Sequence, residues 1–424
     1  MEAFRICGGK KLNGSLEIPT AKNAILPILA GSIMSGGLVV VKDCSKFSDI
    51  INMTEILDYI GAKNIFDGRD LHIQAQLADK NYIGEEYTKK VRSSIFMLGP
   101  LLAKFRKATV AYPGGCNIGN RPIDLHLKGL RALNVKIDER HGYIYCDGNN
   151  MKSGEIHLDF PSVGATENLM MASVMLRGKT TIYNAAKEPE ISDLQNFLNA
   201  MGAKISGGGT STIVVQGVKH LKGCVYRPIS DRIITGTYMI ACAMVGGKCA
   251  FENVEKEHNL AIIDKLKQSG VKISYKKRIL MVSSNGKPKS IENIETMPYP
   301  GFPTDLQSQI LTLQTISRGT SVITENLFET RFKIVDQLTK MGADITIKNR
   351  MAIVKGVQKL YGATVSAFDL RGGAGLAIAG LAAEGYTTVE DVYHIDRGYE
   401  CMESDLQQLG ADIKRIILLI FKKV

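Results

Sequence analysis

A phrase that recurs six times constrains the fold of this 424-residue chain more than any other feature. The phrase is an amphipathic helical segment that ends at a glycine or asparagine and is followed by a strand-like segment. Glycine and asparagine are the residues that a helix C-cap in the left-handed region requires. The six caps are separated by 73, 68, 68, 72 and 68 residues and fall at Gly61, Asn134, Gly202, Gly270, Gly342 and Gly410. We therefore predict six copies of one α/β repeat.

A second phrase runs in phase with the first and indicates how the repeats pack. It is an apolar segment, a glycine turn and a β-branched strand, as in "AILPILAGSIMSGGLVVV" (24–41) and "TGTYMIACAMVGGKCAFEN" (235–253). A helix that is apolar on nearly every side must be buried all round, whereas the amphipathic helix keeps one face in water. We predict an α/β fold of two similar domains, each of three repeats with buried inner helices and outer sheets. A doubly wound sheet is excluded because no Gly-x-Gly-x-x-Gly follows a strand.

The composition narrows the class of ligand. The net charge is +11, but lysines and arginines are spread along the chain, which favours small anionic ligands over nucleic acid. The eight cysteines form no Cys-x-x-Cys and no cluster with histidine, so we expect neither disulfides nor a metal site. We also expect no cofactor. The N-terminus has no apolar signal core and no run could span a membrane, so we expect a cytoplasmic protein. We expect "IILLIF" (416–421) to be a last buried strand.

Polar residues stand at equivalent positions before the inner helices. Their spacing is again the repeat period, and they are Lys22, Arg92, the turn Ser162-Val163-Gly164, Arg232, Asp305 and Arg371. Helix N-termini and basic side chains attract anions, so we expect an anion pocket between the two domains. Asp305 is the exception among the basic residues: it is either a plain helix N-cap or a general base or acceptor for a sugar hydroxyl.

The loops that lead from a short strand to each outer helix form a further set of equivalent positions. They hold Asp49, Cys116 with Arg121, Glu188 and Glu190, His258, Arg331, and Arg397. Cys116 lies in "YPGGCNIGNRPIDLH", directly after two glycines and five residues before an arginine. Such a thiol can donate a proton or act as a thiolate, according to its neighbours.

At these residues the chain resembles the enolpyruvyl transferase family, and within it the enzymes that act on UDP-N-acetylglucosamine. The motifs are "AKNAILPIL", "RSSIFMLGPLLA", "YPGGCNIGNRPIDLH", "PSVGATENLMMA", "NAAKEPEISDLQNFL", "FPTDLQSQ", "FETRF" and "YHIDRGYE", in order over nearly the whole chain. The resemblance implies an inside-out α/β barrel, with one domain at 22–229, the other at 1–21 plus 230–424, and the active site in the cleft between them. It also implies transfer of the enolpyruvyl group of phosphoenolpyruvate to the 3′-hydroxyl of UDP-N-acetylglucosamine, with release of phosphate.

The same resemblance implies roles for individual residues. Cys116 would be the acid at C3 of phosphoenolpyruvate and the target of fosfomycin, and Asp305 would lie at the 3′-hydroxyl. Lys22 and Arg397 complete the expected catalytic set. The expected substrate-binding residues are Lys22, Asn23, Arg92, Arg121, Pro122, Ile123, Asp124, Leu125, Ser162, Val163, Gly164, Asp305, Leu327, Arg331, Asp369, Arg371 and Arg397. Several arginines suit a substrate with about three negative charges, because their forked donors fit phosphate and carboxylate.

The resemblance further implies a role in peptidoglycan synthesis, and so in cell-wall formation, cell shape and division. Two alternatives stay open. The enzyme that makes 5-enolpyruvylshikimate 3-phosphate shares the fold but lacks the Gly-Gly-Cys loop and has Lys-Ser where this chain has "AKNA". An RNA-binding or RNA-cyclase repeat protein would need a catalytic histidine or clustered aromatic residues for base stacking.

Overall fold

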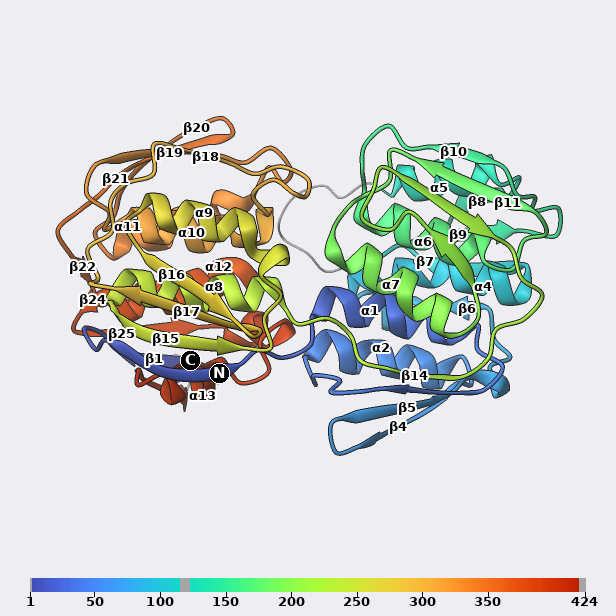
Figure 1. Cartoon of the computed structure of the whole chain (residues 1–424), viewed down its shortest axis with the longest axis horizontal. Coiled ribbons are helices and arrows are strands. Elements are labelled where there is room, and N and C mark those ends of the chain that lie inside the picture. The colour runs from blue at the N-terminus through green and yellow to red at the C-terminus, as the bar shows by residue number, and fades with distance from the viewer. Residues whose placement is uncertain (1, 115–122, 419–424) are drawn as a thin grey trace, which may run out of the picture. The chain divides into compact units, whose positions relative to one another are not determined.

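A computed structural model of the chain describes residues 2–114 and 123–418, which form two compact units (Figure 1). One unit comprises residues 20–229 apart from the gap, and the other comprises 2–19 and 230–418. Both are α/β, as predicted, and each contains three repeats. Within the described ranges, no helix is both long and apolar enough to cross a bilayer.

Three buried helices form the centre of each unit. Nearly every residue in them is buried, and they pack against one another within their unit. In the first unit they are α1 (Lys22–Ser32), α4 (Leu98–Phe105, preceded by the 3-10 helix η2, Arg92–Met97) and α6 (Val163–Ser173). In the second they are α8 (Arg232–Val245), α10 (Gln307–Gln314, preceded by η4, Thr304–Leu306) and α12 (Leu370–Ala382). The prediction of all-round burial for these segments is confirmed.

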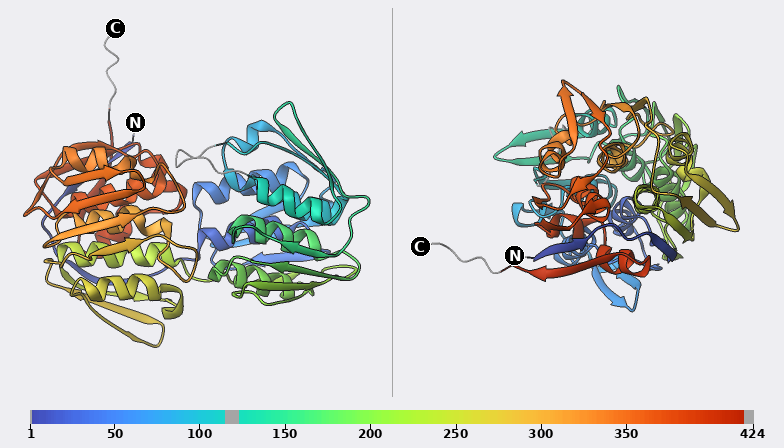
Figure 2. Two further views of the ribbon diagram at one scale, coloured as in Figure 1. Left: turned by 90° about the horizontal axis from the view of Figure 1, so that it is seen from above. Right: turned by 90° about the vertical axis from the view of Figure 1, so that its left-hand side faces the viewer.

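Six four-stranded sheets surround these helices, and Figure 2 shows strands at the periphery of each unit. In all six the first two strands are parallel and the other pairs are antiparallel. The first unit has β14 (Cys224–Tyr226)-β3 (Leu38–Val41)-β5 (Asp70–Gln74)-β4 (Lys63–Asp67), β6 (Tyr82–Ile83)-β7 (Lys107–Ala111)-β9 (Tyr143–Asp147)-β8 (Lys136–Arg140) and β10 (Glu155–His157)-β11 (Lys179–Tyr183)-β13 (Thr212–Gln216)-β12 (Lys204–Ser206). The second has β2 (Leu12–Glu17)-β15 (Gly247–Glu252)-β17 (Ile279–Ser284)-β16 (Lys272–Lys276), β18 (Asn293–Glu295)-β19 (Thr320–Thr324)-β21 (Met351–Lys355)-β20 (Asp344–Lys348) and β23 (Thr364–Ser366)-β25 (Tyr386–Glu390)-β1 (Glu2–Cys7)-β26 (Asp412–Ile417). Identical strand patterns explain why one sequence period serves both units.

The two N-terminal strands complete sheets of the second unit. β1 pairs with both β25 and β26, and β2 pairs with β15, so the blue start of the chain lies beside its red end (Figure 2). β26 is an edge strand that ends at Ile417, whose side chain is 75% exposed. The prediction of a buried strand over 416–421 is therefore wrong at its start, because β26 pairs on one edge only and Ile416 is just partly buried while Ile417 is exposed; residues 419–424 lie outside the described ranges.

The outer helices end where the repeat predicts. They are α2 (Ser48–Tyr59), α5 (Asp124–Ala132), α7 (Pro189–Ala200), α9 (Leu260–Gln268), α11 (Ile334–Lys340) and α13 (Met402–Gln408). Each is followed by a left-handed residue: φ is +93° at Gly61, +64° at Asn134, +103° at Gly202, +89° at Gly270, +91° at Gly342 and +93° at Gly410. The predicted C-caps are confirmed in all six repeats.

The left-handed backbone at the cap positions should by itself favour glycine there. A Cβ at Gly202 would meet no atom within 4 Å, so Gly202→Ala tests only the left-handed backbone. We expect it to lower the free energy of unfolding by about 1–2 kcal/mol. Gly154 in the same unit also has open space but no left-handed φ, so Gly154→Ala should change it by less than about 0.5 kcal/mol. Urea denaturation followed by circular dichroism measures both; equal losses would contradict the cap argument.

Candidate active site

The polar residues predicted at the inner helix starts do lie there. Lys22, Arg92 and Arg232 are the first residues of α1, η2 and α8. Ser162 is the N-cap of α6 and accepts a hydrogen bond from the amide of Ala165 at 3.3 Å. Asp305 lies within η4, and Arg371 is the second residue of α12. Lys22, Arg92 and Ser162 belong to one unit, and the other three residues belong to the other.

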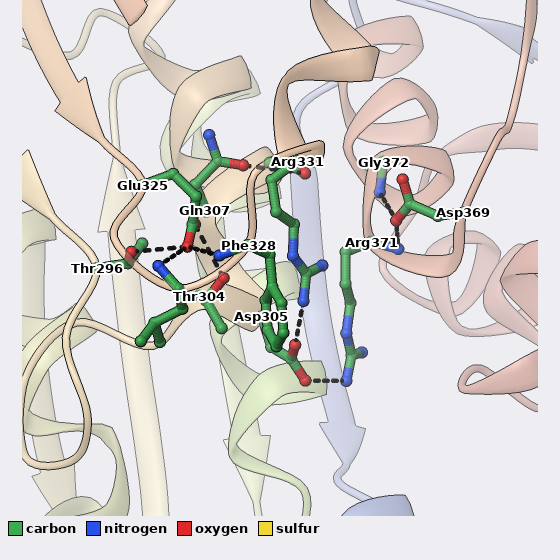
Figure 3. Close-up of polar contacts among 12 residues, drawn as sticks. Thr296, Thr304, Asp305, Gln307, Glu325, Phe328, Arg331, Asp369, Arg371 and Gly372 are labelled. Carbon is green, nitrogen blue, oxygen red and sulfur yellow. Dashed lines mark hydrogen bonds and ion pairs between the residues drawn. The ribbon is translucent and has the colours of Figure 1, made fainter. Parts of the chain in front are cut away.

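In the second unit, Asp305 lies between two buried arginines (Figure 3). Its Oδ1 accepts from Arg331 Nη2 and its Oδ2 from Arg371 Nη2, both at 2.7 Å. The arginine side chains are 2% and 5% exposed, whereas that of Asp305 is 23% exposed. Both arginine side chains are therefore covered by protein, and Asp305 is the most exposed member of this triad. Charge-assisted bonds of this kind fix direction as well as distance.

Arg371 remains charged in this environment. Burial acts to lower its pKa, but the carboxylate of Asp305, with Tyr399 and Asp231, raises the pKa above its usual value. A buried guanidinium without such a partner would be strongly destabilising. Asp305 thus stabilises the charge of Arg371, and Arg371 fixes the orientation of Asp305.

The structure tests one of the two interpretations of Asp305, that of a plain helix N-cap. It is not the N-cap of either helix, since Pro303 precedes η4 and Leu306 precedes α10. Neighbouring repeats do use aspartates as caps: Asp231 accepts from the amides of Ile233 and Ile234, and Asp369 accepts from those of Arg371 and Gly372. The N-cap alternative for Asp305 is therefore wrong, because its oxygens bond to arginines of two other segments.

In the first unit, Lys22 pairs with Asp49. The ammonium lies 3.1 Å from Asp49 Oδ2, and the side chains are 11% and 4% exposed. Lys22 begins α1 and Asp49 is the second residue of α2, so two helix starts bring the pair together. Asn23 follows Lys22 and is partly buried. Asp49 therefore fixes the position of the Lys22 ammonium at the buried start of α1.

The segments 123–125 and 162–164, both expected to contact substrate, meet at His126. This histidine is in α5, directly after Ile123, Asp124 and Leu125. Its ring lies against Gly164, where an added Cβ would come within 3.1 Å of His126 Cε1. The structure thus brings together two of the predicted substrate-contact segments.

Asn168 of α6 holds His126 in one tautomer. Its Oδ1 accepts from the Gly99 amide at 2.6 Å, and its Nδ2 donates to the Ile95 carbonyl at 2.8 Å. Nδ2 is also 3.0 Å from His126 Nδ1, which must therefore be the acceptor. Neither Asn168 nor His126 was predicted as a site residue. The sequence does show a polar Asn168 within a predicted buried helix, but it does not show which residues that side chain contacts.

Arg397 is the last residue of the 3-10 helix η6 (Val392–Arg397). Its neighbour Asp396 is bound by a side chain of β26, that of Arg415. Arg415 binds Asp396 through two bonds, of 2.7 and 3.0 Å, and Glu403 through a bond of 2.7 Å. Burial and the charge of Arg397 lower the pKa of His394, three residues earlier. Arg415 was also not predicted, because it lies on a strand that carries no motif.

The remaining predicted residues are of two kinds. Leu327 lies after β19, and its amide donates to Glu325 Oε1 at 2.8 Å. Cys116, Arg121 and Pro122 lie outside the described residues. Within the described ranges, no group of three or more His, Cys, Asp and Glu side chains is arranged to hold a metal ion.

The family model for EPSP synthase (3-phosphoshikimate 1-carboxyvinyltransferase) matches residues 6–406 of this chain. Solved structures of two enzymes share the fold of this chain. An enolpyruvyl transferase, NikO from Streptomyces tendae, has a TM-score of 0.87 at 21% identity, covering 98% of each chain. EPSP synthase from Acinetobacter baumannii has a TM-score of 0.77 at 18% identity, covering 98% of this chain and 100% of that one. The fold and the family model together define a carboxyvinyltransferase.

Curated relatives divide the family further. A protein of Caldanaerobacter subterraneus is 51% identical over 98% of this chain and all of its own, and one of Carboxydothermus hydrogenoformans is 48% identical over 98% and 99%. One from Clostridium perfringens is 45% identical over 98% and 100%. All three are named UDP-N-acetylglucosamine 1-carboxyvinyltransferase. The chain belongs to this group of the carboxyvinyltransferase family.

The buried histidine makes stability depend on pH. Burial and the charge of Arg92 lower the pKa of His126 from 6.5 to about 4. Between pH 6.5 and pH 4, His126 is therefore protonated in the unfolded chain but not in the folded one. The free energy of unfolding falls as the pH falls through this range. Between pH 7 and pH 5 we expect a loss of about 2 kcal/mol from this group. Urea denaturation at both pH values should show that His126→Gln lacks this part of the loss; equal losses in both proteins would contradict it.

Proposed function

We propose that this protein transfers the 1-carboxyvinyl (enolpyruvyl) group of phosphoenolpyruvate to the 3′-hydroxyl of UDP-N-acetylglucosamine and releases phosphate. The observation that carries this proposal is the identity of 45–51%, over 98% of the chain, to relatives named for a UDP-N-acetylglucosamine transferase. The family model bears the name of the 3-phosphoshikimate enzyme. That reaction is the second candidate, and only the acceptor distinguishes the two.

In the proposed reaction the sugar oxygen adds to C2 of phosphoenolpyruvate while C3 gains a proton. Elimination then breaks the bond from C2 to the phosphate oxygen and removes a proton from C3. Cys116 would supply the proton at C3, an assignment that rests on the sequence motif. Asp305 would accept the 3′-hydroxyl, which agrees with a carboxylate that is more exposed than the arginines behind it.

The basic residues would bind the anionic groups. Lys22, Arg92, Arg121 and Arg397 would contact the phosphate and carboxylate of phosphoenolpyruvate, and bidentate arginine contacts suit both groups. Asn23, the segments 122–125 and 162–164, and Leu327, with Arg331, Asp369 and Arg371, would form the binding site for the nucleotide sugar. Both units would contribute to the reaction. The proposed place of the reaction is the cytoplasm, as a step of peptidoglycan synthesis.

Phosphate release tests the reaction and its acceptor. Wild-type protein with phosphoenolpyruvate and UDP-N-acetylglucosamine should release phosphate in equal amount to the carboxyvinyl ether, identified by mass spectrometry. Omission of either substrate, or Lys22→Gln in the same assay, should abolish release because the proposed anion site then lacks its ligand or its charge. Release with shikimate 3-phosphate as acceptor, and none with the nucleotide sugar, would overturn the proposal in favour of the second candidate.

Selective alkylation tests the role of Cys116. A thiolate opens the epoxide of fosfomycin by forming a C–S bond as the C–O bond breaks, and the new alkoxide takes up a proton. We expect one equivalent of added mass, located on the peptide that contains Cys116, and no turnover afterwards. Cys401 is the internal control: the residue is exposed, but partial desolvation of its thiol and the nearby Glu403 raise the pKa of that thiol. Equal labelling of Cys401 would contradict a special reactivity of Cys116.

A further inference from the structure

A buried carboxyl group outside the predicted set lies at the base of the Asp305 site. Glu325 directly follows β19 and is 1% exposed. Its Oε1 accepts hydrogen bonds from Thr296 Oγ1 and from the amides of Leu327 and Phe328, at 3.0, 2.8 and 3.0 Å. Its Oε2 accepts from Thr304 Oγ1 at 2.9 Å (Figure 3). All four of these donors are neutral, so these bonds contribute geometry and not charge neutralisation.

The four bonds join three segments that are separate in sequence. Thr296 directly follows β18, and Thr304 is the first residue of η4, next to Asp305. Leu327 and Phe328 lie in the loop that leads to η5 (Arg331–Lys333), which carries Arg331. One side chain therefore holds both the segment of the carboxylate and the segment that leads to one of its arginine partners.

Two routes lead from Glu325 to Asp305. The first is direct, through Thr304, the adjacent residue. The second passes through Phe328, whose backbone is bonded to Glu325 and whose ring centre lies 5.2 Å from the guanidinium of Arg331. Arg331 then binds Asp305 Oδ1. A shift of Glu325 would displace Asp305 and its partner together.

From this geometry we infer that Glu325 is a positioning residue for the reaction: it fixes the position of Asp305 through Thr304 and that of Arg331 through the Leu327–Phe328 backbone. The inference rests on the proposed function, in which Asp305 accepts the sugar hydroxyl. Misplacement of a reacting group by about 1 Å costs up to about a hundredfold in rate. Glu325 would therefore act on turnover without touching substrate.

Two threonine variants separate positioning from stability. Thr304→Val removes the bond next to Asp305, and Thr296→Val removes a bond to the same carboxyl group away from Asp305. Thr296 Oγ1 also accepts from the Asn326 amide at 2.9 Å, so Thr296→Val loses one more hydrogen bond. We expect Thr304→Val to lower kcat by about tenfold or more and Thr296→Val to lower it by less than about twofold. The melting temperature should fall at least as far in Thr296→Val.

A double-mutant cycle and a conservative variant complete the test. If Thr304 acts through Asp305, Thr304→Val should have little further effect on kcat in an Asp305→Asn background. Glu325→Gln keeps an acceptor for both amides and can donate to Thr304, so it should retain most of kcat. Glu325→Leu would remove the acceptor of four hydrogen bonds, one from buried Thr296 and three from partly buried groups, and is unsuitable, because loss of folding would hide the effect.

The outcomes separate the two proposals. Wild-type turnover, with kcat in the two threonine variants falling equally or in proportion to their melting temperatures, would overturn the positioning role alone. The same holds if Thr304→Val acts fully in the Asp305→Asn background. Wild-type protein that releases no phosphate from phosphoenolpyruvate and UDP-N-acetylglucosamine would contradict the proposed function, and the positioning role with it.

Discussion

A helix that is buried on every side can carry charged groups only at its ends, and this constraint shapes both units of the protein. Burial of an unpaired charge along such a helix would cost several kcal/mol. The inner helices accordingly have apolar or small neutral residues along most of their length, and Lys22, Arg232 and Arg371 stand in their first turns. The same positions receive the favourable field of the helix N-terminus for anions. Core packing therefore leaves the N-terminal ends of these three helices as the places where they carry charge.

Two buried polar side chains away from the inner helix starts each bond to several segments. Asn168 lies in the middle of α6, fully buried, yet its amide bonds to Gly99, Ile95 and His126. Because the donors and the acceptor of its amide all have partners, Asn168 fixes the positions of these neighbours at little cost in free energy. It ties three elements of one unit together beneath residues 123–125 and 162–164. Glu325 does the same in the other unit, where its carboxyl group joins three segments around Asp305.

Much of the architecture could be predicted from the sequence because it depends on local rules that are repeated six times. A left-handed cap after each outer helix needs Gly or Asn, and a buried helix needs apolar residues on every side. Both patterns are visible without knowledge of the fold, and the structure agrees at Gly202 and Asn134 alike. Repetition also indicated the equivalent helix starts, and so the candidate residues.

The partners of those residues could not be predicted, because repeat spacing aligns positions and says nothing of contacts between repeats. Arg331 and Arg371 were both candidates, but their common bond to Asp305 depends on how η5 and α12 approach η4. The edge position of β26 depends on β1, from the far end of the chain, and so the exposure of Ile417 was not visible in its own segment. Local pattern determines the elements; long-range packing determines which side chains meet.

The two units hold their charged groups in opposite ways, and this bears on what each can bind. In one, the carboxylate of Asp305 lies between two guanidinium groups, and in the other the ammonium of Lys22 faces the carboxylate of Asp49. The two charge-assisted bonds fix the direction of the Asp305 carboxylate, which suits its proposed role as a hydrogen-bond acceptor. The sugar hydroxyl of the proposed reaction would meet a carboxylate that is more exposed than either of the arginines that hold it.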